Sequence, residues 1–439
     1  MDREDVMRFI EDNDVKFIRL QFTDITGRLK NTAITETHIE KAFDGIYFDG
    51  SAVEGFGRAE ESDMLLVPDL DTLALIPWRP QQGKVAMLIC DVLGQDGTPF
   101  DGDPRQILRR AVRQAAGRGY TFNVGPECEF FLFNTDDHGQ PTIETHDKAG
   151  YFDLAPIDLG ENARREMCLV LEDMGFEIEA SHHEVASGQH EIDFRYDEAM
   201  KAADNIMTFK MVVKIVAQKH GLHATFMPKP FHDQAGSGMH INMSLFRGGN
   251  NEFYDPENPQ NISQQARYFI GGIFAHIKAI TALSNPLVNS YKRLIAGFEA
   301  PIYITWAHRN RSPLIRIPAF TGSDARLELR SPDPACNPYL VLAVVLAAGL
   351  EGIEKQIEPP QELEGNAYQM TEKELDLMSA GKLPCSLDAA LDELEKDPLV
   401  HETLGEQAFR HYLNVKRAEW FDFSSEIHDW ELSRYLEIY

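Results

Sequence analysis

Two glutamates are spaced so that they share one face of a strand. They lie in the segment GPECEFFLF, residues 125–133, as Glu127 and Glu129. Successive side chains of a strand point to opposite faces, so both carboxylates point one way while Cys128 and Phe130 point the other. Like charges on one face repel unless a cation lies between them. A solvated strand face is the alternative interpretation, but the apolar residues that follow favour a buried site that binds a cation.

A second pair of glutamates flanks a turn that contains glycine. The segment HHEVASGQHE, residues 182–191, places Glu184 before the turn and Glu191 after it. Such a turn could bring both carboxylates to one point. The segment lacks the helical HExxH spacing of a zinc site, because the residue four positions after His183 is Ser187. Its histidines by themselves are more typical of packing or surface residues than of ligands.

A third segment, residues 229–244, combines glycines with polar residues. Gly236 and Gly238 permit the backbone to approach a ligand closely, and His240 and Ser244 follow them. The segment lacks the third glycine of a GxGxxG motif, so the glycines alone are a weak signal of nucleotide binding.

A fourth segment is rich in arginine. Residues 326–330, RLELR, would place Arg326, Glu328 and Arg330 on one face of a strand. Taken alone, this triplet is equally well interpreted as a structural ion pair. Arginine binds carboxylate and phosphate through two hydrogen bonds at once, so several arginines in an acidic protein favour a site for such anions. The arginines concerned are Arg293, Arg311, Arg316, Arg326 and Arg330.

These four segments together supply glutamates, one histidine and arginines. Oxygen-rich ligand sets favour Mg²⁺ or Mn²⁺ over zinc. Divalent cations beside arginines are typical of phosphoryl transfer, in which positioning and charge neutralisation supply most of the catalysis. The sequence contains neither a P-loop nor the loop set of a protein kinase, so we expect neither of those nucleotide-binding folds.

The elements that must position these residues begin with a β-rich segment. We expect a helix over residues 2–12 and a strand over 15–22 that forms the first arm of a hairpin. A further strand is expected over 84–92. Residues 94–105 are dense in Gly, Asp and Pro and form the clearest boundary in the chain. We therefore predict a small N-terminal domain over residues 1–98 and a larger domain over residues 104–439.

Beyond this boundary, helices and strands follow one another without a strict βαβ order. We expect helices over residues 162–174, 197–220, 262–283 and 338–357, a helical tail over 371–439, and short strands around Leu132, Ile192, Ile241 and Leu327. The mixture predicts an α+β fold rather than a parallel α/β fold.

The composition narrows the class of protein. Of the 439 residues, 43% are hydrophobic and 26% are charged, as in ordinary globular proteins of about two or three domains. Lys and Arg number 42 against 70 Asp and Glu, which gives a net charge of −28. So acidic a surface repels a phosphate backbone, and we expect no nucleic-acid partner.

Membrane and export signals are not evident in the sequence. The longest strongly apolar run ends at Glu351 and falls short of the roughly 20 residues that span a bilayer. The acidic start does not resemble a signal peptide. The five cysteines form no CxxC pair and are interpreted as reduced core thiols. We expect a cytoplasmic protein with no membrane partner.

Several longer stretches contain or add to these motifs, and they occur in a fixed order along essentially the whole chain. They are FDGSAVEGFGRAEESDM (48–64), GPECEFFLF, SHHEVASGQHEID, the KP-x₄-AGSGMH-x₃-S pattern (229–244), NSYKRLIAGFEAP, NRSPLIRIP and RLELRSPDPACNPYL. In these stretches the chain resembles type I glutamine synthetases. The resemblance implies a small β-grasp-like N-terminal domain and a catalytic domain with a strand-built funnel. It also implies a dodecamer of two hexameric rings, with active sites between neighbouring subunits.

The resemblance further implies the reaction. ATP would phosphorylate the γ-carboxylate of glutamate, and ammonia would attack the γ-glutamyl phosphate to give glutamine, with two or more Mg²⁺ or Mn²⁺ ions in each subunit. One alternative is a γ-glutamyl ligase for a larger amine. Asp49 and Asp63 favour ammonium, because a small cation needs an anionic pocket. The other alternative is a nitrogen-sensing binding protein without turnover.

The resemblance assigns roles to individual residues. One cation would be held by Glu129, Glu184 and Glu191, and a second, nearer ATP, by Glu127, His240 and Glu328. Glutamate would be bound by Arg293, Arg311, Arg330, Glu299 and the backbone around Ala235 and Gly236. ATP and its phosphates would be contacted by Glu179, Ser244, Arg311, Arg316 and Arg326. Catalysis would involve Asp49 as proton acceptor, Asp63 in the ammonium site, Glu299 on a closing flap and Arg311.

The resemblance also bears on regulation. The region around Tyr368 lacks the proline context of the tyrosine that is adenylylated in some members, so we expect no such control. The chain is similar instead to the alpha-like subgroup, in which an arginine after the DGS segment couples glutamine binding to inhibition. Arg58 occupies that place. The alternative is a surface arginine paired with Glu60 or Glu61, a common and weak interaction. Ala235, where many members have Asn, departs from the family pattern.

Overall fold

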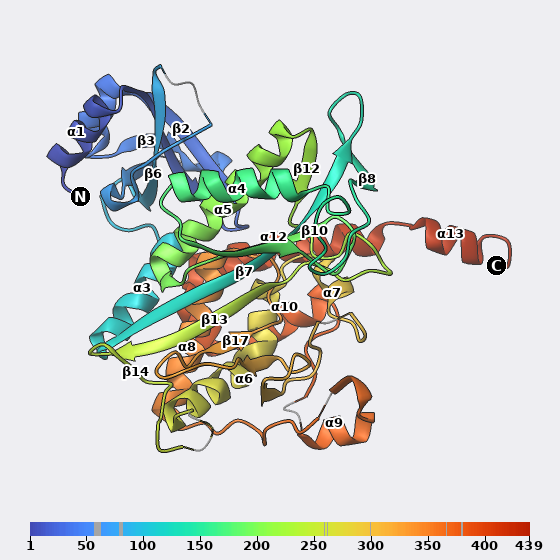
Figure 1. The fold of residues 1–439 in the computed structure, drawn as a ribbon. Coiled ribbons are helices and arrows are strands. Elements are labelled where there is room, and N and C mark those ends of the chain that lie inside the picture. Colours follow the sequence, from blue (N-terminus) through green and yellow to red (C-terminus); the bar gives the residue numbers. More distant parts are fainter. Residues whose placement is uncertain are drawn as a thin grey trace.

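The computed structural model of the chain describes residues 1–56, 63–78, 82–258, 260, 262–298, 300–365, 367–378 and 381–439. Its strands form two separate sheets, a smaller one in the N-terminal part and a larger one in the remainder (Figure 1). Helices pack against the larger sheet, and the C-terminal helix projects away from the body of the molecule (Figure 1). The mixture of helices with two sheets confirms the predicted α+β class.

The smaller sheet has the strand order β2-β1-β6-β4-β3, with β5 paired to β6. Its strands are β1 (Val15–Thr23), β2 (Leu29–Thr35), β3 (Ile46–Asp49), β4 (Asp63–Pro68), β5 (Ala74–Leu75) and β6 (Lys84–Leu93). The predicted hairpin is confirmed, because β1 pairs with β2 in antiparallel fashion. The predicted N-terminal helix is also confirmed as α1 (Arg3–Asp12), which begins after Asp2, whose side chain caps the helix by accepting from Asp5 N.

The larger sheet has the order β15-β16-β17-β13-β7-β10-β9, and β8, β11, β12 and β14 add to its sides. Its strands are β7 (Tyr120–Thr135), β8 (Pro141–Thr145), β9 (Ile178–His183), β10 (Gln189–Phe194), β11 (Asp197–Glu198), β12 (Leu222–Thr225), β13 (Met239–Arg247), β14 (Asn250–Asn251), β15 (Trp306–His308), β16 (Ile315–Ile317) and β17 (Leu327–Leu329). The four strands predicted around Leu132, Ile192, Ile241 and Leu327 are all present.

The helices cover the core of this sheet and extend into the tail. They are α2 (Ile39–Ala42), α3 (Pro104–Gly117), α4 (Glu161–Asp173), α5 (Ala199–Lys219), α6 (Gln264–Ser284), α7 (Ser290–Arg293), α8 (Pro338–Lys355), α9 (Glu372–Met378), α10 (Leu387–Lys396), α11 (Pro398–Leu404), α12 (Glu406–Ser425) and α13 (Asp429–Tyr435). The four long helices predicted within the larger domain correspond to α4, α5, α6 and α8. Helices α6 and α8 are apolar nearly all round because both are buried.

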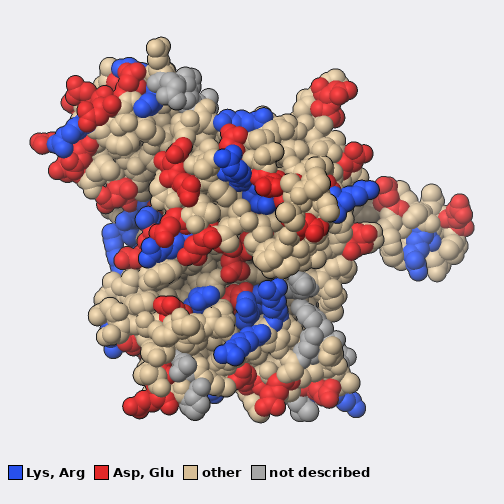
Figure 2. Space-filling view, in the orientation of Figure 1, with Lys and Arg blue, Asp and Glu red and all other residues tan. Residues whose placement is uncertain are grey.

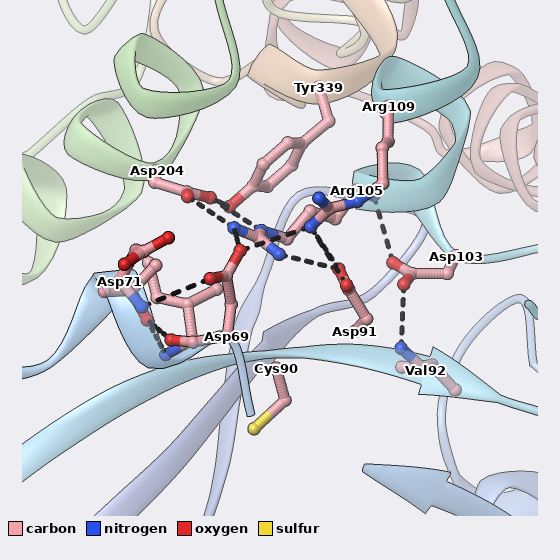
Figure 3. A network of polar contacts seen from close by, with 12 residues as sticks. Asp69, Asp71, Cys90, Asp91, Val92, Asp103, Arg105, Arg109, Asp204 and Tyr339 are labelled. Atoms are coloured by element: carbon pink, nitrogen blue, oxygen red, sulfur yellow. Dashed lines mark hydrogen bonds and ion pairs between the residues drawn. The ribbon is translucent and has the colours of Figure 1, made fainter. Parts of the chain in front are cut away.

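A network of charged side chains joins the two parts of the chain (Figure 3). Arg105 of α3 donates to Asp91 of β6 at 2.6 Å, to Asp69 after β4 at 2.8 Å, and to Asp204 of α5 at 2.8 and 3.0 Å. Arg109 donates to Asp91 at 2.9 Å, and Tyr339 of α8 donates to Asp204 at 2.7 Å. We call these residues the Arg105 network. Asp91 lies in the smaller sheet, and Asp69 directly follows strand β4 of that sheet. The network therefore connects the smaller sheet to the helices of the larger part.

The surface and the cysteines qualify two expectations. Acidic side chains are spread over the face seen in Figure 2, while basic ones gather near its middle, over β7 and β17. The interpretation of all five cysteines as core thiols is wrong for Cys385, which is exposed in a loop; Cys168 is half-buried and packs against the core. All five are free. In the described parts of the chain, every helix is too short or too polar to cross a membrane.

Candidate active site

The candidate site forms where β7 meets its neighbours in the larger sheet. On β7, Glu127 lies opposite His240 of β13 and opposite Asp193 of β10, while Glu129 lies opposite Glu191 of β10. Strand pairing therefore brings residues 113 positions apart into contact. The predicted alternation holds, because both glutamates lie on one face and Cys128 between them is buried on the other.

The first cluster consists of Glu127, His240 and Glu328. One ligand atom from each lies within 4.8 Å of the others. His240 Nδ1 lies 3.1 Å from Glu127 Oε2, and the Asn242 amide donates to Glu127 Oε1 at 2.8 Å. Burial by itself would raise the pKa of Glu127, but His240 and Asn242 outweigh it and lower the pKa to about 2. An ionised carboxylate beside an imidazole suits a divalent cation.

Glu328 of this cluster is buried between two arginines. Arg316 of β16 donates to Glu328 Oε2 at 2.7 Å, and Arg330 donates to Oε1. Arg316 lies directly opposite Glu328 in the pairing of β16 with β17. Arg326 donates instead to Asn242 at 3.3 Å. The ion-pair interpretation of the RLELR triplet is therefore right for Glu328 and Arg330, whereas Arg326 bonds to the neighbouring strand.

The second cluster consists of His182, Glu184 and Glu191, whose ligand atoms also lie within 4.8 Å of one another. Glu129 accepts a hydrogen bond from Gln189 Nε2 at 2.9 Å and one from a backbone amide at 2.8 Å. Burial and the charge of Glu184 raise the pKa of Glu129 to about 8, and burial with nearby acidic groups raises the pKa of Glu191 well above its ordinary value. Carboxylates that resist ionisation in this way would be stabilised by a cation.

The glycine segment of residues 236–238 packs against Arg293. A Cβ on Gly238 would lie 2.5 Å from a guanidinium nitrogen of Arg293. Arg293 is buried and donates to the carbonyl oxygens of Ser331 at 2.7 Å and Arg330 at 3.1 Å. The missing side chain therefore makes room for an arginine beside the second cluster.

A cavity of about 450 Å³ adjoins the first cluster. Its volume lies within the usual range for small-molecule sites. Its walls include Glu127 and three of the residues predicted to contact ATP, namely Glu179, Ser244 and Arg326. The structure therefore brings these four residues, from β7, β9, β13 and the segment before β17, to one hollow.

Asp49 and Asp63 belong to the smaller sheet. They lie directly opposite each other on β3 and β4, and both are exposed. Asp49 accepts from the hydroxyl of Ser51 at 2.6 Å and from its backbone amide at 2.9 Å, and these bonds lower the pKa of Asp49. Within one chain, this pair lies on a different sheet from both clusters (Figure 1).

Arg311 and Ala235, which were also predicted to lie in the site, are not members of either cluster. Arg311 is exposed in the bend after β15, and Ala235 is half-buried against the aromatic cluster around Phe131. Glu299 and Arg58 lie outside the described residues, as does the side chain of Tyr368.

Three residues of the site were not predicted from the sequence. His182 belongs to the second cluster, Gln189 donates to Glu129, and Asn242 donates to Glu127. Asn242 lies between His240 and Ser244 at a spacing of two, so strand alternation could have found it. His182 stands next to the selected glutamates, but nothing in the sequence distinguishes it from His183. Gln189 offers no signal, because its contact with Glu129 arises only from the pairing of β7 with β10.

Comparisons with known proteins bear on this site. The family model described as glutamine synthetase, catalytic domain, matches residues 101–435, and the one described as glutamine synthetase, beta-Grasp domain, matches residues 14–95. A glutamine synthetase of Clostridium saccharobutylicum is 57% identical over 438 residues, which cover 100% of this chain and 99% of that protein. One of Methanosarcina mazei is 52% identical over 437 residues, with 99% and 98% covered.

Solved structures agree with these matches. A structure of GmaS in complex with ADP superposes with a TM-score of 0.90 at 34% identity, covering 98% of this chain and 99% of that one. The cryo-EM structure of Plasmodium falciparum glutamine synthetase gives a TM-score of 0.88 at 25% identity, with 99% of both chains covered.

The matches define the class first: an enzyme of the ligase type, with an N-terminal β-grasp domain and a larger catalytic domain. The chain belongs to the glutamine synthetase family. Its activity is the ATP-dependent ligation of ammonia to glutamate, which yields glutamine.

Proposed function

We propose that the two clusters hold two divalent cations, Mg²⁺ or Mn²⁺, at the end of a cavity that holds ATP. Their donor atoms fit such ions, because they are carboxylate oxygens with one or two imidazole nitrogens. Glu184 and Glu191 of the second cluster, together with Glu129, would hold one ion, and Glu127, His240 and Glu328 of the first cluster would hold the other. When bound, the ions would neutralise the phosphate oxygens and make the γ-phosphorus more electrophilic.

The chain's own residues orient ATP. Glu179 and Ser244 contact the nucleotide, while Arg311, Arg316 and Arg326 neutralise phosphate charge that grows during transfer. Contact of three of these residues with one cavity supports the assignment. The structural relative GmaS was solved as a complex with ADP, which supports a nucleotide ligand for a chain of this fold.

Glutamate binds through Arg293, Arg311, Arg330 and the backbone around Ala235 and Gly236. An oxygen of its γ-carboxylate attacks the γ-phosphorus of ATP, ADP leaves, and γ-glutamyl phosphate forms. Asp49 then takes a proton from ammonium, with Asp63 contributing negative charge. The ammonia nitrogen attacks the γ-carbonyl carbon, and inorganic phosphate leaves with the proton that the new amide nitrogen loses, while Glu299 closes over the intermediate.

The complete site lies between neighbouring subunits of a cytoplasmic dodecamer made of two hexameric rings. Two observations support an oligomer. The Asp49–Asp63 pair and the two clusters lie on different sheets of one chain. Large apolar side chains are also exposed near the C-terminus, in α12, in the projecting α13 and just after it; they include Phe421, Trp430 and Leu436. Mass photometry of the purified protein would measure the assembly directly.

The observation that carries this proposal is the meeting of two carboxylate clusters, buried arginines and a cavity on adjacent strands. Phosphate release from ATP and glutamate, measured with ammonium and with a series of amines, tests it. Release that depends on ammonium is expected. Release only with a larger amine would favour the γ-glutamyl ligase alternative, and no release with any nucleophile would favour a sensor without turnover.

The role of Asp49 has its own test. Asp49→Ala should bind ATP and glutamate but use ammonium poorly, because the proton acceptor is lost. Hydroxylamine is neutral at neutral pH and should restore part of the turnover as the hydroxamate. Equal losses with the two nucleophiles would remove the proton-acceptor role.

Arg58 is proposed to couple glutamine binding to inhibition. Arg58→Ala should leave the basal rate nearly intact and weaken inhibition by glutamine about tenfold, a coupling of about 1.4 kcal/mol. Inhibition curves that superimpose for variant and wild type would assign Arg58 to the surface alone.

A further inference from the structure

The hairpin of β9 and β10 has a second, buried face. Its front face carries Glu184 and Glu191 of the second cluster. On its back face, His183 and His190 lie directly opposite each other, and both are fully buried. Because neighbouring residues of a strand point to opposite faces, the backbone that places these two imidazoles also places the adjoining glutamates.

Asp147 holds both arms of this hairpin from behind. Its Oδ1 accepts from the backbone amide of Gly188, in the turn, at 3.0 Å, and lies 3.1 Å from His183 Nε2, at the end of β9. Asp147 is only 5% exposed. One carboxylate oxygen therefore spans the turn that separates Glu184 from Glu191.

The His183 ring is held between two acceptors. His183 Nδ1 lies 2.7 Å from the carbonyl oxygen of Glu184, and Nε2 faces the Asp147 carboxylate. The other oxygen of Asp147, Oδ2, lies 3.1 Å from His146 Nε2, so each oxygen of this buried carboxylate has an imidazole nitrogen beside it.

His190 is held by a separate pair. Arg164 of α4 donates to His190 Nδ1 at 2.8 Å and lies 2.9 Å from Asp158. Arginine can only donate, so Nδ1 accepts and the ring hydrogen of neutral His190 is on Nε2. The back face thus has two carboxylates: Asp158 lies beside Arg164, and Asp147 lies between His183 and His146.

The back face could either hold a third cation or position the hairpin, and this arrangement favours the second role. His146, Asp147, Asp158 and His190 bring ligand-type atoms within 4.8 Å of one another, which by residue type alone describes a third cation site. His190 Nε2 carries hydrogen, however, and cannot ligate. Asp158 is already paired with the Arg164 guanidinium, which would repel a divalent cation in this buried region.

We propose that Asp147 is a positioning residue, which fixes the β9–β10 hairpin so that Glu184 and Glu191 are preorganised to hold their cation. The inference rests on the proposed metal role of these two glutamates. It adds that the affinity for the cation depends on a carboxylate that lies on the opposite face of the sheet and does not touch the ion.

Mn²⁺ binding to the purified, full-length enzyme, followed by electron paramagnetic resonance without substrates, tests the proposal. Asp147→Asn keeps the size of the side chain and an acceptor for Gly188 but replaces the carboxylate that faces His183 with a neutral amide. We expect the weaker of the measured Mn²⁺ affinities to fall about tenfold with an unchanged number of sites, and KM for ATP at saturating Mn²⁺ to stay within about twofold.

Asp103→Asn is the matched control, because Asp103 is equally buried and accepts two backbone hydrogen bonds far from the hairpin. It should change thermal stability without changing Mn²⁺ affinity. Unchanged Mn²⁺ binding in Asp147→Asn, with weaker binding in Glu184→Gln, would overturn the positioning role alone. Unchanged binding in Glu184→Gln as well would overturn the metal assignment. Loss of one whole equivalent of Mn²⁺ from Asp147→Asn would show that the back face is a cation site and would also overturn the proposal.

Discussion

The acidic site of the larger sheet and the Arg105 network contain similar carboxylates in opposite electrostatic states. In the network, burial alone would raise the pKa of Asp69, but Arg105 and Arg109 outweigh it and lower the pKa below its ordinary value (Figure 3). In the site, burial and Glu184 raise the pKa of Glu129 to about 8. One region therefore supplies its own cations, and the other leaves part of its negative charge unpaired.

The difference in charge pairing indicates a different role for each region. Carboxylates paired with buried arginines hold two parts of the chain together and need nothing further. Carboxylates that repel one another reduce the stability of the protein alone, and this cost is offset when a cation binds. Glu328 belongs to both types, because it is paired with Arg316 and Arg330 and also lies in the first cluster.

Glu328 should give the largest effect on turnover. Glu328→Gln keeps the shape but removes the charge that faces two arginines and a cation. We expect at least a thousandfold loss of phosphoryl transfer, on the scale of about 4 kcal/mol in the barrier, with the fold retained by circular dichroism. Near-normal phosphate release at saturating Mg²⁺ would contradict the assignment of Glu328 to the metal site.

Arg105 should give the largest effect on stability. Arg105→Met leaves three buried or half-buried carboxylates without their shared cation, and removal of one partner from such a network costs about 3–5 kcal/mol. Urea denaturation would measure it. Arg195→Met is the control, because its pair with Glu177 is exposed and screened by solvent and should contribute little to stability. Similar losses in both variants would remove the distinction between the network and the surface.

The same amide substitution should act with opposite sign in the two regions. Asp69→Asn should destabilise the metal-free protein by about 1 kcal/mol, because it weakens bonds to two arginines. Glu129→Gln should stabilise the metal-free protein at pH 8.5, because it removes a repelled charge while the oxygen still accepts from Gln189. Thermal melts in chelator would compare them, and destabilisation by both would contradict the electrostatic contrast.

The pH dependence of stability should show the smallest effect. The folded pKa of Glu129 is about 8, above its ordinary value of 4.5, so the folded protein binds more protons than the unfolded chain between these values. The contribution of Glu129 to stability is therefore present at low pH and is lost as pH rises from about 4.5 to about 8. For Asp69 the sign is reversed, and its contribution is lost only as pH falls below the ordinary range. Metal-free melting temperatures should fall by a few degrees between pH 6 and 8, and Mg²⁺ should suppress the fall; a rise without metal would reverse this interpretation.

Local patterns predicted most of the elements. The apolar spacing of α4 and the alternation of β7 depend on neighbours three or two residues away, so they can be read along the chain. The shared face of Glu127 and Glu129 followed from the same alternation, and the meeting of Glu184 with Glu191 followed from the turn between them. The RLELR triplet also indicated the pairing of Glu328 with Arg330. The pairing with Arg316 could not be predicted in this way, because Arg316 reaches Glu328 only through the pairing of β16 with β17.

The sequence by itself determined the residue types of the site, their order along the chain, and hence the chemistry of carboxylates and arginines around phosphate. Only the tertiary structure decided which carboxylates are neutralised by arginine and which remain unpaired. The physical reason is that a charge responds to its neighbours in space and to its burial, and both are set by contacts between distant segments. The sequence did not indicate the direction of either pKa shift, and in the fold the pKa of Asp69 is lowered whereas that of Glu129 is raised.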